Sequence, residues 1–262
     1  MKIALTIAGS DSGGGAGIQA DLKTFQQFGV FGTSVVVALT AQNTREVRAV
    51  ETVSAAMIAA QLAALADDLP PAALKTGMLA DIGIVRQVGQ AIREYGWAPL
   101  VVDPVMVSTS GHRLLSLEAE EVVRESLVPM AALVTPNLDE AAILTGRAVH
   151  DVPSMELAGE TLLSYGAAAA LVKGGHLAGG ELTDVLVTPA GVRHFTRPRI
   201  ETTSLHGTGC TLSAAVTAGL ALGRGLERAV EDALDFVHRA IAAAPGLGGG
   251  HGPVNHTVGP PV

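Results

Sequence analysis

Short apolar runs rich in β-branched residues alternate along this chain with longer amphipathic stretches, and this alternation constrains the fold more than any other feature. The apolar runs lie at residues 3–8, 34–39, 73–76, 100–102, 132–135, 169–173, 184–187 and 194–196. Apolar runs of this kind, separated by helical patterns, are typical of parallel strands that helices cover. We therefore predict an α/β fold around a buried, mostly parallel sheet.

The amphipathic stretches predict the helices between those strands. Ile18, Leu22, Phe25 and Phe28 recur at spacings of four and three, and Gly29 follows at a position where helices commonly end. Further helices are predicted over residues 54–65, from a cap at Asp81 to a stop at Gly96, and over residues 209–222 and 226–243.

The connections between these elements are short, and no internal repeat is present. We therefore predict a single domain over residues 1–245. Residues 246–262 are rich in Gly, Pro and His, which predicts an irregular C-terminal tail. His251 and His256 of this tail suggest a metal site, but the composition favours a loosely packed segment.

Composition and charge exclude several classes of protein. Charged residues make up only 16% of the 262, and 48% are hydrophobic, which excludes a disordered chain. The net charge of −8 offers no basic face for nucleic acid. One cysteine excludes a disulfide framework and Cys-rich zinc sites. No window reaches the roughly 18 apolar residues of a membrane span. We expect a cytoplasmic globular protein that neither enters membranes nor binds nucleic acid.

A glycine run, GSDSGGGAG at residues 9–17, follows the first predicted strand and opens the first helix. Five glycines in nine residues let the backbone approach a ligand closely, although a tight turn would also need some of them. GAGIQA at residues 15–20 also matches a dinucleotide-binding fingerprint. That match is weak, because no ribose-binding acid ends the next strand. We interpret the run as a ligand cradle.

The segment HGTGC at residues 206–210 is the most specific feature of the sequence. Two glycines precede a run of good helix formers, so the amides of residues 207–210 would point out of a helix N-terminus, where they could bind an oxyanion or a phosphoryl group. The helix dipole there also predicts a more acidic thiol for Cys210. A lone cysteine is otherwise a small buried apolar residue.

Four polar residues follow the predicted strands, at the edge where open α/β sheets bind ligands. These are Asp103, Asn137, Glu140 and Lys173. Taken singly, Asp103 and Asn137 could be helix caps and Lys173 a solvated strand end. Together they provide carboxylates for a magnesium ion and a lysine for phosphate, and phosphoryl transfer uses both kinds of group.

The chain resembles the hydroxymethylpyrimidine/phosphomethylpyrimidine kinases of thiamine biosynthesis, a vitamin-kinase group of the ribokinase-like superfamily. The resemblance runs nearly end to end, and Glu140 belongs to it. The motifs that carry it are AGSDSGGGAGIQADLK at residues 8–23, LTAQN at 39–43, KTGM at 75–78, VDPVM at 102–106, TPN at 135–137, VKGGH at 172–176, HGTGC at 206–210 and GHGPVNH at 250–256. The sequence departs from the expected pattern at Ser204 and Leu205 and around STSGH at 108–112.

The resemblance implies a three-layer α/β/α sandwich with a central, mostly parallel sheet of about eight or more strands, assembled as a homodimer. It also implies transfer of the ATP γ-phosphate, with Mg²⁺, to 4-amino-5-hydroxymethyl-2-methylpyrimidine and then to its monophosphate. Two alternatives stay open: a pyridoxine or pyridoxal kinase, and a binding protein of the same fold that uses the glycine loops only to sense a ligand.

The resemblance also implies roles for individual residues. The pyrimidine would contact Gln42, which recognises the ring edge, together with Asp21, Gly9 and Met78. The anion hole would consist of Gly207, Thr208 and Gly209, with Cys210 in the position of the catalytic base. The nucleotide phosphates would contact Lys173, Asn137 and Thr208, and magnesium would be held by Asp103 and Glu140.

Overall fold

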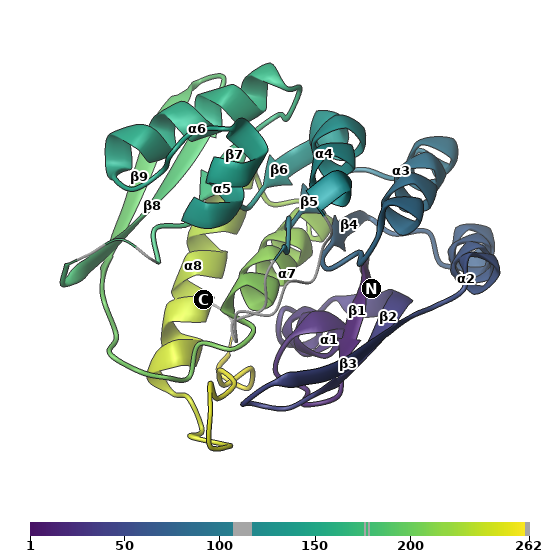
Figure 1. Cartoon of the computed structure of the whole chain (residues 1–262), viewed down its shortest axis with the longest axis horizontal. Helices are drawn as coiled ribbons and strands as arrows, with labels where there is room; N and C mark the ends of the chain where they lie inside the picture. Colours follow the sequence, from purple (N-terminus) through teal and green to yellow (C-terminus); the bar gives the residue numbers. More distant parts are fainter. Residues whose placement is uncertain (107–116, 176, 178, 260–262) are drawn as a thin grey trace.

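A computed structural model describes residues 1–106, 117–175, 177 and 179–259 of the chain. The described residues form one nine-stranded sheet in the order β3-β2-β1-β4-β5-β6-β7-β8-β9 (Figure 1). The strands are β1 (Ile3–Asp11), β2 (Phe31–Gln42), β3 (Val47–Thr52), β4 (Ala73–Thr76), β5 (Leu100–Val102), β6 (Ala131–Val134), β7 (Ala170–Val172), β8 (Glu181–Thr188) and β9 (Gly191–Pro198).

Six neighbouring strands of the sheet, β2, β1, β4, β5, β6 and β7, are parallel. β3 pairs antiparallel with β2 at one edge, and at the other edge β8 pairs antiparallel with β7 and β9 with β8. Parallel strands need a crossover between them, and the helices make these crossovers. The helices are α1 (Gly17–Gln27), α2 (Ala55–Asp68), α3 (Ile82–Tyr95), α4 (Leu117–Ser126), α5 (Leu138–Thr145), α6 (Val152–Ser164), α7 (Thr208–Ala221) and α8 (Leu226–Ala242), with a short 3₁₀ turn at Val128–Met130.

Two separate apolar cores lie on the two faces of the sheet. One core takes its helical side chains mainly from α2, α3 and α4, and a smaller cluster continues it under α5 and α6. The other core is built from α1, α7 and α8 (Figure 1). This arrangement confirms the predicted three-layer α/β/α sandwich. α7 is apolar almost all round and is buried along most of its length, which places its N-terminus inside the molecule.

Local sequence signals set the helix boundaries much as expected. The Asp81 side chain accepts a hydrogen bond from the Ile84 amide at the start of α3, and Gly96 ends that helix in the left-handed conformation. All eight predicted strands are present. β3 is absent from the predicted elements because its residues beyond Val47 are exposed and form no apolar run. α4 and α6 are also absent from the predicted helices, although Asp151 caps α6 and Pro153 lies in its first turn.

The C-terminal tail is irregular, but the prediction that it is loosely packed is wrong for the residues described. Val254 and His256 are buried, and the Asn255 amide donates to the Ala240 carbonyl oxygen at 3.0 Å. The segment also pairs with the chain before α7, where the His206 amide donates to the Gly252 carbonyl oxygen at 3.1 Å. Sequence composition could not show this packing, because long-range contacts and not local pattern hold the segment in place.

None of the described helices is long and apolar enough to cross a bilayer. The sequence departure at residues 108–112 and the motif residue His176 lie outside the described residues.

Candidate active site

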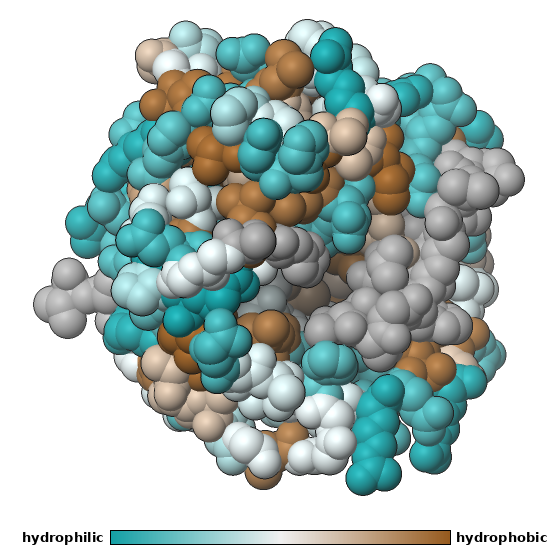
Figure 2. Space-filling view, turned by 60° about the vertical axis from the view of Figure 1, so that its left-hand side comes forward, coloured by the Kyte–Doolittle hydropathy of each residue, from teal (hydrophilic) through white to brown (hydrophobic). Residues whose placement is uncertain are grey.

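The carboxyl ends of the parallel strands open onto a cavity of about 570 Å³. Its lining comes from the loop after β1, the ends of β4, β5, β6 and β7, the turn before α7, and one side of α8. In the space-filling view this side of the molecule is hollowed near its centre, with both hydrophobic and hydrophilic residues around the hollow (Figure 2). The predicted strand-end site is therefore one continuous cavity.

The Asp11 carboxylate organises the glycine loop that follows β1. It accepts hydrogen bonds from the amides of Gly13 at 2.8 Å, Gly15 at 3.1 Å and Ala16 at 2.9 Å. His206 Nε2 lies 2.8 Å from Asp11 Oδ2 and ties this loop to the turn before α7. Burial raises the pKa of Asp11, but the hydrogen bonds from His206 and the backbone outweigh it and hold that pKa below its usual value.

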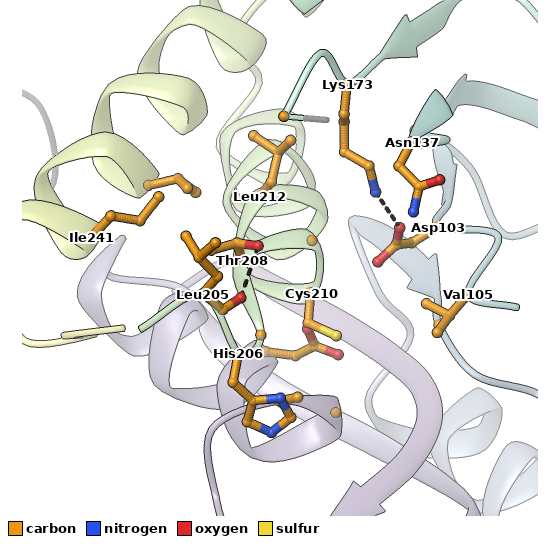
Figure 3. A pocket seen from close by; sticks show the side chains of 18 of the residues that line it. Asp103, Val105, Asn137, Lys173, Leu205, His206, Thr208, Cys210, Leu212 and Ile241 are labelled. Carbon is orange, nitrogen blue, oxygen red and sulfur yellow. Dashed lines mark hydrogen bonds and ion pairs between the residues drawn. The ribbon is translucent and has the colours of Figure 1, made fainter. Parts of the chain in front are cut away.

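The predicted anion-hole turn lies against this loop. Gly207 caps α7 with φ +82°, and a side chain there would overlap the carbonyl oxygen of Gly15. A Cβ at Gly209 would lie 3.3 Å from Lys173 Nζ, so glycine leaves the ammonium group close to the helix N-terminus. Thr208 Oγ1 donates to the Leu205 carbonyl oxygen at 3.1 Å (Figure 3). The turn thus presents helix amides and a cation to the same part of the cavity.

The structure places Cys210 in this turn, as expected, but the predicted acidic thiol is wrong. Burial raises the pKa of Cys210 to about 12, and the nearby carboxylates of Asp21 and Asp103 raise it as well. The ammonium of Lys75 opposes this shift without reversing it. The helix dipole lowers the pKa of Cys210 by less than the loss of hydration raises it. The sequence does not reveal that loss of hydration. The thiol is therefore protonated at neutral pH.

A buried lysine lies next to Cys210, and sequence reasoning assigned it no role. Lys75 Nζ donates to Asp21 Oδ1 at 2.7 Å and to the Cys210 carbonyl oxygen at 3.4 Å, and neither charged side chain is exposed. Thr6 Oγ1 donates to the other carboxylate oxygen of Asp21 at 2.6 Å. Asp21 does line the cavity, as predicted, but its oxygens are already paired. A lysine inside the apolar run of a predicted strand was the available signal.

The strand-end residues Asp103, Lys173 and Glu140 meet as predicted. Lys173 Nζ lies 3.3 Å from Asp103 Oδ1 (Figure 3). It also lies 3.6 Å from Glu140 Oε2. Ser213 Oγ donates to the other oxygen of Asp103 at 3.1 Å. Burial raises the pKa of Asp103, but Lys173 and Lys75 outweigh it and keep that pKa low. The pKa of Lys173 is raised, because the two carboxylates outweigh its own burial.

Asn137 and Glu140 form a capping box at the start of α5. Asn137 Oδ1 accepts from the Glu140 amide at 2.9 Å, and Glu140 Oε2 accepts from the Asn137 amide at 2.7 Å. Asn137 therefore caps α5, as the alternative interpretation of this residue predicted. Its contact with a nucleotide stays a prediction. Burial raises the pKa of Glu140 to about 7, although Lys173 opposes the shift.

The donor set fits a magnesium ion. Asp103 and Glu140 bring carboxylate oxygens to the same ammonium group, and magnesium is commonly held by one or two carboxylates together with substrate phosphates. Within the described ranges no three His, Cys, Asp or Glu side chains converge into a site made of protein ligands alone. The arrangement therefore suits a metal that arrives with a polyphosphate.

The opposite end of the cavity holds the other predicted binding residues. The Gly9 amide donates to the Met78 carbonyl oxygen at 3.2 Å, and a side chain on Gly9 would overlap the end of the Met78 side chain. Gln42 lines the same end, where its Oε1 lies 3.2 Å from Thr40 Oγ1 and its Nε2 lies 3.4 Å from His206 Nε2. All three residues line the cavity, as predicted.

An apolar wall completes the cavity beyond Lys173, and sequence reasoning did not find it. Leu212 of α7 and Leu234, Val237 and Ile241 of α8 form the wall, and Leu212 and Ile241 flank the turn before α7 (Figure 3). In the sequence these residues look like ordinary core positions on amphipathic helices. The wall can pack against a flat, apolar ring system.

The sequence was compared with protein-family models and with known proteins, and both comparisons identify the same kinase family. The sequence model of the phosphomethylpyrimidine kinase family matches residues 11–255. A hydroxymethylpyrimidine/phosphomethylpyrimidine kinase of Rhizobium meliloti is 52% identical, over 97% of this chain and 96% of the relative. The protein of the same name from Escherichia coli is 45% identical, also over 97% of this chain and 96% of the relative.

Solved structures of two kinds of vitamin kinase are similar to this chain. A phosphomethylpyrimidine kinase from Clostridium difficile superposes with a TM-score of 0.83 at 43% identity and covers 92% of this chain and 100% of its own. An ADP complex of Bacillus subtilis pyridoxal kinase has a TM-score of 0.92 at 38% identity, with 98% of both chains covered. Pyridoxal kinase from Staphylococcus aureus in complex with pyridoxal has a TM-score of 0.92 at 32% identity, with 99% of this chain and 96% of that chain covered.

Proposed function

Since the chain belongs to the phosphomethylpyrimidine kinase family, we propose that it transfers the γ-phosphoryl group of ATP to 4-amino-5-hydroxymethyl-2-methylpyrimidine and then to the monophosphate of that pyrimidine. The observation that carries this proposal is the series of contacts along one cavity. Gln42 lies beside His206, the turn from Gly207 to Cys210 follows His206 in the chain, and Gly209 of that turn lies beside Lys173, which pairs with Asp103.

This series of contacts assigns each part of the reactants a place. The pyrimidine ring lies between Gly9 and Met78, with its polar edge on the Gln42 amide. The adenine ring of ATP packs against the apolar wall of α7 and α8, and its phosphates extend past Lys173 and Asn137. The γ-phosphoryl group then meets the amides of residues 207–209, next to the hydroxymethyl group of the substrate.

Charge stabilisation supplies most of the catalysis in this arrangement, because phosphoryl transfer asks little of a base. The turn amides and Lys173 face the charge that develops on the transferred group. Magnesium, held by Asp103 and Glu140 when bound with ATP, neutralises phosphate charge. Cys210 contacts the substrate hydroxyl as a neutral thiol and orients it, since its raised pKa excludes a preformed thiolate.

A pyridoxal kinase is the second candidate, and the TM-scores of 0.92 to two pyridoxal kinases favour it. Gln42 favours the pyrimidine, because an amide can both donate to and accept from an aminopyrimidine edge, where pyridoxal offers a phenolic oxygen. The names of the curated relatives cited above agree with the pyrimidine. We also expect a homodimer, as the family resemblance implies, and, from the composition, a cytoplasmic location.

The proposal is tested by incubating the purified chain with ATP, Mg²⁺ and the hydroxymethylpyrimidine, and following the products by mass spectrometry. We expect the monophosphate first, then the diphosphate, with one ADP released for each transfer. Replacement of Lys173 by Met is the matched control, and it should reduce both transfers together. No phosphorylated pyrimidine above the level of the enzyme-free reaction would refute the proposal.

A further inference from the structure

The C-terminal segment reaches the turn before α7 through a buried side chain to which neither the family resemblance nor the proposed mechanism assigns a role. His256 is 5% exposed, and its Nε2 lies 2.9 Å from Thr211 Oγ1 in the first turn of α7. An Asn255 side chain that accepts from the Thr257 amide at 2.9 Å fixes the local turn around His256. The Asn255 amide in turn holds the segment on α8.

The direction of the hydrogen bonds follows from the partners. Thr211 Oγ1 also lies 2.8 Å from the carbonyl oxygen of Gly207, which can only accept. The single hydroxyl hydrogen of Thr211 therefore points to Gly207, and the hydroxyl oxygen accepts from His256 Nε2–H. The result is a chain of two hydrogen bonds from the C-terminal segment to the first residue of the predicted anion hole.

The charge state of His256 agrees with this chain. Burial, together with the nearby Lys23 and His206, lowers the pKa of His256 to about 4, so the ring is neutral at neutral pH. A neutral ring carries one hydrogen, and the contact with Thr211 places it on Nε2. The Gly207 carbonyl, which also accepts from the Thr211 amide at 2.8 Å, is part of the planar peptide between Gly207 and Thr208, so a group that holds this carbonyl also holds that peptide.

We propose that His256 is a positioning residue for phosphoryl transfer, which acts through Thr211 to hold the Gly207 peptide, and with it the anion-hole amides, in the orientation that binds the transferred group. This inference rests on the proposed function for its kinetic consequences but on geometry alone for its structural ones. It makes the C-terminal segment a working part of the active site, although no residue of the segment touches the reactants.

Kinetics of matched variants test the proposal. His256→Leu removes the donor, and His256→Gln keeps an N–H group near the position of Nε2. We expect His256→Leu to lower kcat about 3- to 10-fold, the worth of one buried hydrogen bond, with KM for ATP and pyrimidine changed less than twofold. His256→Gln should recover most of the loss. His251→Leu, an exposed histidine of the same segment, should leave both constants unchanged.

The Thr211 partner provides an independent pair of variants if His256→Leu fails to fold. Thr211→Val should lower kcat as His256→Leu does, and Thr211→Ser should restore it. The double variant with both apolar replacements should be no slower than the slower single variant, because the two residues act in one chain. Multiplied effects in the double variant, or losses in KM alone, would overturn the proposal.

Hydrogen–deuterium exchange separates this inference from the proposed function. In the absence of any substrate, amides of residues 205–212 should exchange at least threefold faster in His256→Leu than in the unmodified chain, and His251→Leu should show no change. Unchanged exchange and unchanged kcat would together refute the role of His256. Faster exchange in a chain that phosphorylates no pyrimidine would refute the proposed function and leave the hydrogen-bond chain standing.

Discussion

Lys75 and Asp21 form an ion pair of 2.7 Å in the wall of the cavity, and solvent reaches neither side chain. Burial raises the pKa of Asp21, while its partner Lys75 opposes that shift. The attraction between the two charges therefore offsets the hydration that each loses on burial, so each charge is stable in the interior only while the other is present.

Replacement of Lys75 by Met should consequently lower the free energy of unfolding by about 3–5 kcal/mol, because it leaves the Asp21 carboxylate buried without its cation. Urea denaturation measures this change. Lys2→Met, at an exposed lysine, is the matched control and should change stability by less than about 0.5 kcal/mol. Equal stability of the two variants would show that the buried pair is dispensable.

Gln42→Ala should weaken the pyrimidine and spare the nucleotide. The lost amide leaves polar groups of the ring unpaired, at a cost of about 1–3 kcal/mol, or roughly 5- to 150-fold in affinity. Isothermal titration calorimetry with each ligand alone checks this, and Lys173→Met should show the opposite pattern, with weaker ATP and unchanged pyrimidine. Equal losses for both ligands in Gln42→Ala would mean that Gln42 does not recognise the ring.

The thiol of Cys210 should react slowly with iodoacetamide. With a pKa raised to about 12, the fraction of thiolate at pH 7.5 is about 10³-fold below that of a free cysteine. Alkylation of the folded chain should accelerate as the pH rises past 9 without reaching a plateau. The chain in urea is the control, since it has one cysteine and exposes it. A titration midpoint below 8.5 in the folded chain would contradict the raised pKa.

His256 should make stability fall in mild acid. Its pKa is about 4 in the folded chain and about 6.5 when unfolded, so the unfolded state binds the proton more tightly. The stabilisation is complete above pH 6.5 and is lost as the pH falls toward 4, by about 2 kcal/mol between pH 7.5 and pH 5. Urea unfolding of the unmodified chain and of His256→Gln at both pH values isolates this contribution. The same pH dependence in both proteins would exclude His256 as its source.

Local pattern was enough to predict eight of the nine described strands, the caps of α3 at Asp81 and Gly96, and the two glycine loops. Apolar periodicity marks a buried strand wherever it occurs, and a glycine at position 207 is required by the backbone itself. Because parallel strands end at one edge, the meeting of Asp103 with Lys173, 70 residues apart, also followed from the fold class.

What the sequence did not show depends on burial and on distant partners. The acidity of Cys210 was predicted with the wrong sign, because the helix dipole is visible in the sequence and the loss of hydration is not. The buried pairing of Asp21 with Lys75, 54 residues away in the chain, was also not visible in the sequence. The contact of His256 with Thr211 spans 45 residues and links the Gly-, Pro- and His-rich tail to the site.

A competition assay tests most directly whether the protein phosphorylates a hydroxymethylpyrimidine in preference to pyridoxal. Equal concentrations of the two vitamins, both well below saturation, are incubated with ATP, Mg²⁺ and the chain, and the initial rates of the two phosphorylated products are compared. Their ratio equals the ratio of the two kcat/KM values. The account predicts at least tenfold more pyrimidine phosphate than pyridoxal phosphate. An equal or greater rate for pyridoxal would contradict it.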